Sequence, residues 1–564
     1  MSLITPLVNR HWAAGLLLAA LTLGVYSNAA PPAFVFDDAA VLLAPTLGGV
    51  ETIPRLFVEP ARPREFLYRP LAMASVAVDR SLYGRDFRAY HMTNIVLHLL
   101  ATLAVFALLK SLSVPAPLFA AAVFAVHPIH TEAVDAVFNR SEILATLFVA
   151  VALVVLARGA ASRPVLAHAS ASLLYFFGLL SRESAVTLPA LAAFVLWFGR
   201  PELERGRRLR LLIPLLALLL PLAVYLWMRS AALGLAGSPL HSVLEAVGYQ
   251  SFSQRLGLVA TTFRDYWRMM IWPWPLRATY QDYLVHGIGG AVALHGVLLA
   301  VVLAFRRQCP GGLLGVAFFY VALLPSSKLM TDPAWLAERF TYLPSVGFAI
   351  VVASLSPQLV RLGRPAATAL QAALIAALAL TAHARNRDWH SSTLLWEAEV
   401  RHGPRDWLAL LNLSQAYLDA GRLEEVVDLC RRGAAVAPER STLATNAGVA
   451  LVGLGRVAEA ETAFRRAVLL NDGDSEDHAN LARLLVLTER RPEAAQAYAA
   501  AIAREPNLAR QHLLRGYMLL QCHGDAEGAG REYQAALLLS PHLSGAIEGL
   551  RTVRAAGRRG GGNR

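Results

Sequence analysis

The sequence predicts an all-α protein in which a bundle of membrane-crossing helices precedes a solenoid of shorter helix pairs. Three observations lead to this fold class. The 564-residue chain is 56% hydrophobic and only 16% charged, and a water-soluble protein of this size could not bury so much apolar surface. The long apolar runs lie almost entirely before residue 384. From residue 385 the sequence changes to alanine-rich segments of mixed charge that repeat at a regular interval.

Eleven apolar runs are the candidate membrane crossings. They are residues 11–29, 90–109, 116–128, 141–157, 165–180, 184–198, 209–228, 291–305, 311–325, 341–356 and 366–384. The third and sixth are short, because a bilayer core of about 30 Å takes roughly 20 helical residues to cross. Segment 257–275 is amphipathic and contains Arg264, Asp265 and Arg268, so it predicts an interfacial or re-entrant helix.

The net charge of +12 comes from short basic clusters between the runs, which indicates membrane topology rather than a nucleic-acid partner. If each apolar run crosses the membrane once, most of these clusters lie on the same side of it as the N-terminus. They contain Lys110, Arg158, Arg163, Arg200, Arg205, Arg207, Arg208, Arg210, Arg306, Arg307, Arg361 and Arg364. This side is predicted to be the cytoplasm and to hold the N-terminus. Loops 30–89, 129–140, 181–183, 229–290 and 326–340, with everything after 384, are then extracytoplasmic. The excess of arginine over two lysines indicates a GC-rich, bacterial genome, so the expected location is a bacterial inner membrane.

The first apolar run also has the pattern of a signal peptide, with Arg10 before it and the sequence SNAA at 27–30. Cleavage there would leave the topology unchanged. The largest early outside loop, 30–89, includes residues 71–83, whose apolar positions recur at helical spacing. With Asp79 and Arg80 on its other face, this segment predicts a helix in the membrane interface.

Residues 407–543 predict four repeats of 34 residues. Gly421 and Gly455 are 34 residues apart, as are Ala460 and Ala494. This period, with small residues where helices cross, is typical of tetratricopeptide repeats. The units are 407–440, 441–474, 475–508 and 509–543; a linker at 385–406 precedes them, and a basic, Gly-rich tail at 544–564 is expected to be disordered.

The outside loops carry unusual pairs of acids and bases. Asp37 and Asp38 follow the first run, and further acid and base clusters lie at 127–134, 139–142, 181–183 and 337–344. Taken alone, each has an ordinary explanation, such as an arginine that reaches the membrane surface. Their placement on one side of the membrane suggests a single polar site. His127 and His130 lack a third ligand at metal spacing, and the three cysteines are far apart, so no metal site is predicted.

Several of these motifs, in this order, resemble the transmembrane and tetratricopeptide-repeat protein O-mannosyltransferases. They are Phe36-Asp37-Asp38, YRPL at 68–71, YHMTNIVLH at 90–98, HPIHTEAV at 127–134 and AERFTYLPS at 337–345. The resemblance extends through Trp389 and Trp396 into the repeats. Two departures leave the details of the donor open: Asn139 precedes Arg140 where the family usually has glycine, and Arg182 stands where lysine is common.

The resemblance implies a GT-C-like membrane glycosyltransferase without a cofactor. The donor would be a polyprenyl-phosphate sugar, mannose being the family expectation, and the acceptor a Ser or Thr hydroxyl of an exported protein bound by the repeats. A carboxylate must take the hydroxyl proton, so Asp37 and then Asp38 are the predicted bases. The arginines predicted to bind the leaving phosphate are Arg140, Arg182 and Arg339. Other predicted substrate contacts are Tyr68, Arg69, His91, His127, His130, Glu132, Glu183 and Glu338.

Two other function classes are compatible with parts of the sequence. A non-catalytic scaffold could use the repeats to bind exported proteins, but eleven crossings exceed what an anchor needs. A transporter would place charges near the middle of its crossings and show related halves, whereas this chain has acids and arginines at the ends of the runs. A divalent cation is compatible with the predicted chemistry and is not favoured.

Overall fold

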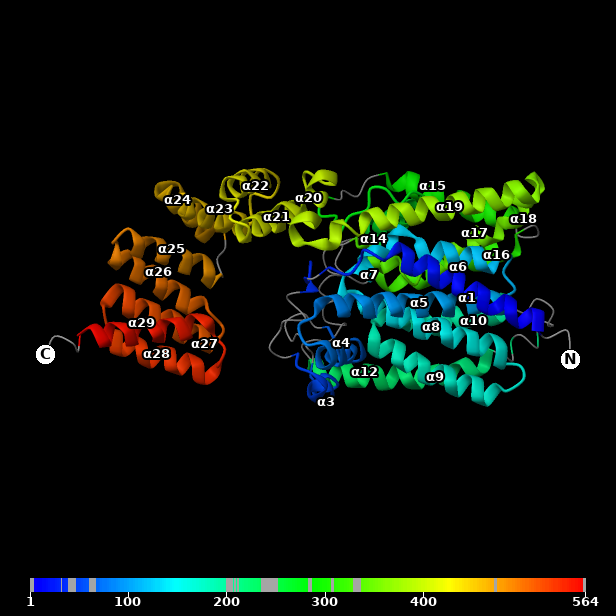
Figure 1. Ribbon diagram of the computed structural model, residues 1–564, viewed down its shortest axis with the longest axis horizontal. Coiled ribbons are helices and arrows are strands. Elements are labelled where there is room, and N and C mark those ends of the chain that lie inside the picture. The colour runs from blue at the N-terminus through cyan, green and yellow to red at the C-terminus, as the bar shows by residue number, and fades with distance from the viewer. Residues whose placement is uncertain are drawn as a thin grey trace. The chain divides into compact units, whose positions relative to one another are not determined.

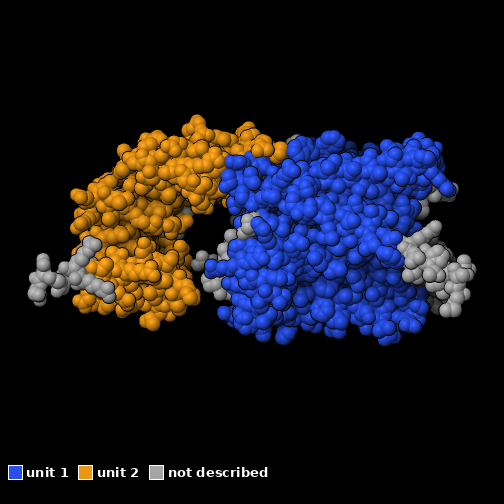
Figure 2. Space-filling model, viewed as in Figure 1, with its two compact units in different colours: residues 1–398 blue, residues 399–564 orange. Residues whose placement is uncertain are grey.

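The computed structural model describes residues 5–31, 33–38, 47–59, 67–198, 212–234, 252–282, 287–305, 309–327, 336–470 and 474–560, with single positions at 206 and 209. This described part of the chain is helical and contains no β-sheet (Figure 1). The chain divides into two compact units, residues 1–398 and 399–564, coloured separately in Figure 2. The boundary falls inside the predicted linker 385–406, so the first part of that linker belongs to the membrane unit.

Long helices form the body of the first unit. They are α1 (Thr5–Val25), α5 (Phe87–Ser111), α6 (Pro117–Val126), α8 (Arg140–Gly159), α9 (Pro164–Ser181), α10 (Leu188–Phe198), α12 (Leu219–Leu233), α14 (Phe252–Ile271), α15 (Ile288–Ala304), α16 (Pro310–Leu323), α17 (Ser345–Ser354) and α19 (Arg364–Arg385). Helices α1, α5, α8 and α9 run alongside one another in Figure 1, and α5 packs on α8 and α8 on α9.

Further helices, most of them of three to five residues, lie between or after these. They are η1 (Val50–Thr52), α3 (Ile53–Leu56), α4 (Pro70–Tyr83), η3 (Pro128–His130), α7 (Thr131–Asp135), η4 (Val137–Asn139), η5 (Glu183–Thr187), η6 (Ile213–Leu218), η8 (Leu324–Ser326), η9 (Glu338–Thr341), α18 (Ser356–Leu359), η10 (Val360–Leu362), η11 (Asp388–His390) and α20 (Ser392–His402).

Six helical stretches among the described residues are long and apolar enough to cross a membrane. They are Phe87–Ser111, Val137–Gly159, Pro164–Ser181, Ile213–Leu233, Ser345–Leu362 and Arg364–His390. A seventh arises if the pair Pro117–Val126 and Pro128–Asp135, bent by 49°, is one broken span. Each of the other four predicted runs coincides with a shorter apolar helix. A polytopic helical membrane protein is therefore confirmed, whereas eleven complete crossings are not.

Segment 257–275, predicted to be interfacial or re-entrant, lies mostly in α14, which is not among the candidate spans. The ring of Trp267 on this helix lies 4.3 Å from that of Phe319 on α16. Helices α16 and α17 pack closely because both have glycine at the crossing. A Cβ atom at Gly315 would lie 2.6 Å from the carbonyl oxygen of Gly347, so a larger residue would separate the two backbones.

Helix α4 corrects one sequence-based expectation. The predicted helix at 71–83 is present, but Asp79 is buried instead of lying on a polar outer face. Its carboxylate pairs with Arg140 at 2.6 Å. The apolar side of α4, including Ala72 and Val76, packs with Leu56 and Leu144 in a small core of its own. Asp79 follows Val76 by three residues, so it lies on the same packed face of the helix.

The second unit contains the four predicted helix pairs. They are α21 (Trp407–Asp419) with α22 (Leu423–Val436), α23 (Ser441–Gly453) with α24 (Val457–Leu470), α25 (Ser475–Leu487) with α26 (Arg491–Arg504), and α27 (Leu508–Met518), continued by η12 (Leu519–His523), with α28 (Ala526–Leu539). Gly421 and Gly455 lie in the turns within the first two pairs, both at a φ of +72°, where glycine is favoured. Ala460 and Ala494 are fully buried where the helices meet.

The expected disorder of tail 544–564 is wrong for most of its length. Residues Ser544–Gly560 form helix α29, and the last four residues lie outside the described part of the chain. Ala546 is buried, and Leu550 and Val553 pack beside it against the core around Tyr533. These apolar positions share one helical face, which covers the last repeat pair, and Arg551 and Arg554 are exposed.

Some predicted features lie outside the described residues. They are positions 39–46 and 60–66 of the first outside loop and the arginines at 200, 205, 207, 208, 210, 306 and 307.

Candidate active site at one end of the membrane unit

The predicted outside loops meet at one end of the helical bundle. Asp38 from the first loop accepts hydrogen bonds from the backbone N–H groups of Val137 and Phe138 in the second, at 2.9 and 2.7 Å. The backbone N–H of Arg339, at the start of the tenth predicted run, donates to Glu132 at 2.8 Å. Segments far apart in sequence thus form one polar region.

The two predicted bases have different surroundings. Asp38 is fully buried and serves as an acceptor for two backbone amides, whereas Asp37 is half-buried. Phe36, directly before them, has a φ of +60°, which is unfavourable for a residue with a large side chain. Such strain persists only where neighbouring contacts fix the backbone. Asp38 therefore holds the loop in place, and Asp37 is the more exposed of the two carboxylates.

Burial raises the pKa of Asp38 from 3.8 to about 7, although the two backbone N–H groups act in the opposite direction. Below that pH the folded protein binds a proton that the unfolded chain has released, so stability falls as pH rises from about 4 towards 7. We expect Asp38→Asn to flatten this decline. Thermal unfolding of both proteins from about pH 5 to about pH 8 would measure it, and parallel curves would show that Asp38 does not titrate there.

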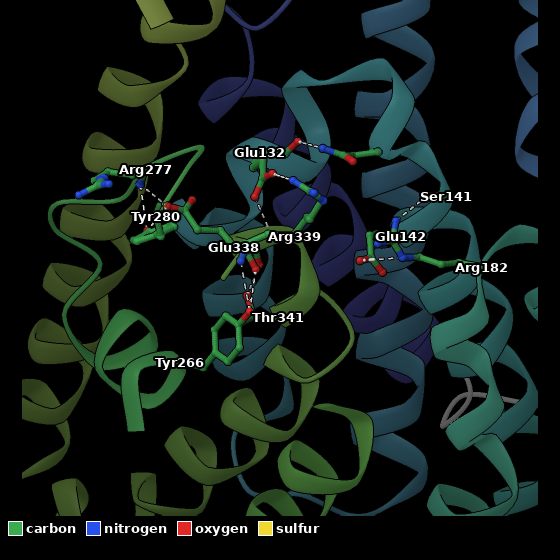
Figure 3. A network of polar contacts seen from close by, with 12 residues as sticks. Glu132, Ser141, Glu142, Arg182, Tyr266, Arg277, Tyr280, Glu338, Arg339 and Thr341 are labelled. Atoms are coloured by element: carbon green, nitrogen blue, oxygen red, sulfur yellow. Dashed lines mark hydrogen bonds and ion pairs between the residues drawn. The ribbon is translucent and has the colours of Figure 1, made fainter. Parts of the chain in front are cut away.

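A network of ionic side chains lies beside this loop (Figure 3). Arg339 pairs with the buried Glu132 through its side chain as well as its backbone. Burial tends to lower the pKa of Arg339. The opposing effect of the negative charges of Glu132 and then Asp37 is larger, so the pKa lies above its usual range. Glu338 accepts from the hydroxyl of Tyr280 at 2.7 Å and pairs with Arg385. Glu338 and Arg339 are adjacent in the η9 turn and have opposite charges. Each forms an ion pair with a different residue, Arg385 and Glu132 respectively.

Arg182 joins a second group of charges to the network. Its guanidinium lies 2.9 Å from Glu142 and donates to the hydroxyl of Ser141 at 3.0 Å. It also lies 5.5 Å from the centre of the Phe340 ring, and Arg339 lies 5.2 Å from the same ring. Two of the three arginines predicted to bind phosphate therefore flank one aromatic side chain.

Glu183 is held between two arginines. Arg69 lies 3.1 Å from one carboxylate oxygen and Arg229 lies 2.9 Å from the other. Both arginines lower the pKa of Glu183 to about 2, against the effect of burial, so this carboxylate is ionised. An acid of this kind orients its arginine partners and cannot serve as a proton donor near neutral pH.

Arg140 is separate from this network. It is 1% exposed, and its guanidinium donates to Asp79 at 2.6 Å, to Asn94 at 2.7 Å and to the carbonyl of Tyr90 at 3.0 Å. Protein groups thus surround it, and they tie α4, α5 and α8 together. We assign Arg140 a structural role and leave it out of the proposed phosphate site.

The aromatic and histidine residues predicted to contact substrate lie deeper in the protein. The hydroxyl of Tyr68 donates to the carbonyl of Phe57 at 2.7 Å. Three histidines each have a polar partner at Nε2. His91 lies 3.3 Å from the carbonyl of Ala33, and His127 lies 3.0 Å from the carbonyl of Met270. His130 lies 2.9 Å from the hydroxyl of Ser345. All four side chains are buried. No group of three metal-ligating side chains occurs among the residues that the structure describes.

Three residues of this region were missed by the sequence analysis. Arg229 ends an apolar run, Tyr280 lies in a long loop, and Arg385 begins the predicted linker. Each reaches Glu183 or Glu338 from a distant part of the chain. No local motif marked them, since only the folded chain brings them to those glutamates.

An apolar cavity of about 620 Å³ lies among the helices of the first unit. It is lined by side chains of α6, α14, α15, α17 and α19, among them Trp267, Leu298 and Phe348. His127, immediately before the turn that leads to Glu132, also lines it, as do Arg264, Asp265 and Arg268. The cavity therefore combines a largely apolar wall with His127 and three charged side chains of α14.

Comparison with known proteins gives a consistent set of relatives. The chain is 24% identical over 481 residues to a protein O-mannosyl-transferase of Caenorhabditis elegans, covering 81% of this chain and 62% of that protein. This chain is similar to protein O-mannosyl-transferases. It is also 24% identical over 515 residues to human protein O-mannosyl-transferase TMTC3, covering 80% of this chain and 55% of the relative. The predicted resemblance is confirmed, although the chain spans little more than half the length of these relatives.

No family model matches the sequence. Among solved structures, the MamA protein is 18% identical with a TM-score of 0.24, over 28% of this chain and 85% of MamA. The tetratricopeptide-repeat protein YrrB is 16% identical with a TM-score of 0.23, over 29% of this chain and 84% of YrrB. These scores are too low to support any conclusion.

Proposed function

We propose that this chain is a membrane glycosyltransferase that moves a hexose, mannose in the first instance, from a polyprenyl phosphate to Ser or Thr hydroxyls of exported proteins. The observation that carries the proposal is a half-buried acid, Asp37, on a loop that Asp38 holds to the bundle by two backbone hydrogen bonds. The charge of Asp37 also acts on Arg339. The names of the relatives support the same activity class.

The proposed reaction uses these groups in one displacement. Asp37 accepts the proton of the acceptor hydroxyl as its oxygen attacks the anomeric carbon of the sugar. The bond from that carbon to the phosphate oxygen breaks, and the phosphate leaves with the bonding electrons. Arg339 and Arg182 stabilise the negative charge that develops on it, since arginine suits planar, charge-assisted contacts with phosphate. Glu132 and Glu142 keep the two guanidinium groups in position.

The cavity supports a lipid-linked donor. Its walls are mostly apolar helix surfaces, which suit an isoprenoid chain, and the arginines of the proposed site suit a phosphate. A sugar bound to a nucleotide would instead need a polar pocket for its base and ribose.

The repeats are proposed to bind the acceptor protein, because solenoids of helix pairs offer extended surfaces for peptides. We further propose that the chain lies in a bacterial inner membrane with its N-terminus cytoplasmic, and that Asp37 and the repeats are extracytoplasmic. The basic loops of the sequence support this orientation.

Mass spectrometry of exported proteins, with and without the gene, tests the activity. We expect the deletion strain to lose hexose from particular Ser or Thr residues and to regain it when the gene is restored. An unchanged set of modified peptides would contradict the proposal and favour a non-catalytic scaffold.

A reconstituted assay then tests the donor. Purified full-length protein in lipid nanodiscs would receive an identified acceptor peptide with either polyprenyl-phosphate mannose or nucleotide-linked mannose. Transfer from the lipid-linked sugar alone is the expected result. Transfer from the nucleotide-linked sugar would exclude the proposed role of the cavity.

A further inference from the structure

The segment 383–396, which runs from the last turn of α19 into α20, contacts the end of α1. The last carbonyl of α1, that of Val25, accepts a hydrogen bond from Asn386 at 2.9 Å and lies 3.0 Å from a ring nitrogen of His383. Asn28 donates to the carbonyl of His383 at 2.9 Å. The Nε2 atom of His390 lies 2.5 Å from the carbonyl of Asn28. These bonds satisfy carbonyls that a helix end otherwise leaves without a partner.

Two tryptophans of the same segment contact the residue before Asp37. The ring of Phe36 lies 6.0 Å from that of Trp389, edge to face, and 5.7 Å from that of Trp396. Both tryptophans are buried, at 1% and 5% exposure. Phe36 is also the residue with the positive φ, so these ring contacts lie where the backbone conformation needs support.

The segment reaches the phosphate side of the proposed site as well. The side chain of Arg385 pairs with Glu338 and lies 3.4 Å from the carbonyl of Pro128. Glu338 directly precedes Arg339, and Pro128 begins the turn that leads to Glu132. One stretch of chain therefore contacts both the loop of the proposed base and the turn of the proposed phosphate-binding arginine.

We propose that segment 383–396 positions Asp37 for sugar transfer, with Trp389 and Trp396 as positioning residues that fix Phe36. This inference rests on the proposed function. A base must lie within hydrogen-bond reach of the proton that it takes, and small displacements of a reacting group lower rates steeply. The loop is held on one side by the amides that bind Asp38 and on the other by these rings.

Trp396→Ala and Trp396→Phe in the full-length protein test the inference, with Leu394→Ala as the matched control. Leu394 lies on the same helix, α20, and is 46% exposed. Hydrogen exchange of residues 26–38 measures loop order without any substrate. We expect faster exchange in Trp396→Ala, and wild-type exchange in Leu394→Ala and in the repeats of every variant.

The transfer assay measures the second consequence. Trp396→Ala should lower kcat about 10- to 100-fold with little change in KM for the acceptor, and Trp396→Phe should recover most of it. Unchanged exchange in Trp396→Ala, or faster exchange with unchanged kcat, would overturn the inference. If the wild-type protein transfers no sugar, the proposed function fails, and hydrogen exchange alone then decides whether the segment holds the loop.

Discussion

Asp37→Asn is expected to lower sugar transfer by about 10²- to 10⁴-fold, the range that a positioned general base contributes. The amide keeps the size of the side chain but cannot take the hydroxyl proton. Transfer would be measured on exported proteins by mass spectrometry and in nanodiscs with polyprenyl-phosphate mannose. Membrane insertion and thermal unfolding should match those of the wild-type protein, because Asp37 is only half-buried.

The matched control is Asp86→Asn, which changes an exposed acid just before α5 whose side chain makes no cap hydrogen bond. It should transfer sugar at the wild-type rate. Full activity in Asp37→Asn would show that Asp37 is not the base. If Asp38→Asn were also fully active, neither acid could be.

Arg140→Leu is expected to destabilise the membrane unit by about 3–5 kcal/mol, because it leaves the carboxylate of Asp79 buried without its charged partner. Both side chains of this pair are almost inaccessible, at 1% and 5% exposure. Thermal unfolding in nanodiscs would measure the loss. Arg158→Leu, which changes an exposed arginine on the same helix, should have little effect.

A second substitution separates structure from substrate binding. Adding Asp79→Leu to Arg140→Leu should recover at least about half of the lost stability, since an apolar pair of similar volume replaces the ion pair. A stable Arg140→Leu protein that fails to transfer sugar would instead indicate that Arg140 binds the donor phosphate, as its sequence motif predicts.

The sequence predicted the helices and repeats well because their signals are local. Each apolar run coincides with a helix, and Gly421 and Gly455 mark the turns that their spacing indicated. The acidic pair and the motifs around Glu132 and Arg339 were also recognisable, since they combine unusual polar residues with apolar surroundings.

Partners that come from distant segments were not predictable. Asp79 looked like the polar side of an interfacial helix, yet it pairs with an arginine 61 residues away. Arg385 belonged to a presumed linker, yet it reaches Glu338. The tail was predicted to be disordered because of its many arginines and glycines. Its three apolar positions Ala546, Leu550 and Val553, which share one helical face, were overlooked. In each case the deciding interaction depends on the folded neighbour rather than on the local pattern.

The hydrogen bonds at the end of α1 have a consequence for synthesis of the protein. Asn28 and its partners His383 and His390 are separated by 355 and 362 residues of chain. At about 5–20 residues per second, a ribosome needs roughly 20–70 s to add that length. The loop that follows α1 must therefore wait for the last membrane helix before it can adopt its final form. Nascent chains should remain inactive until translation has passed α19.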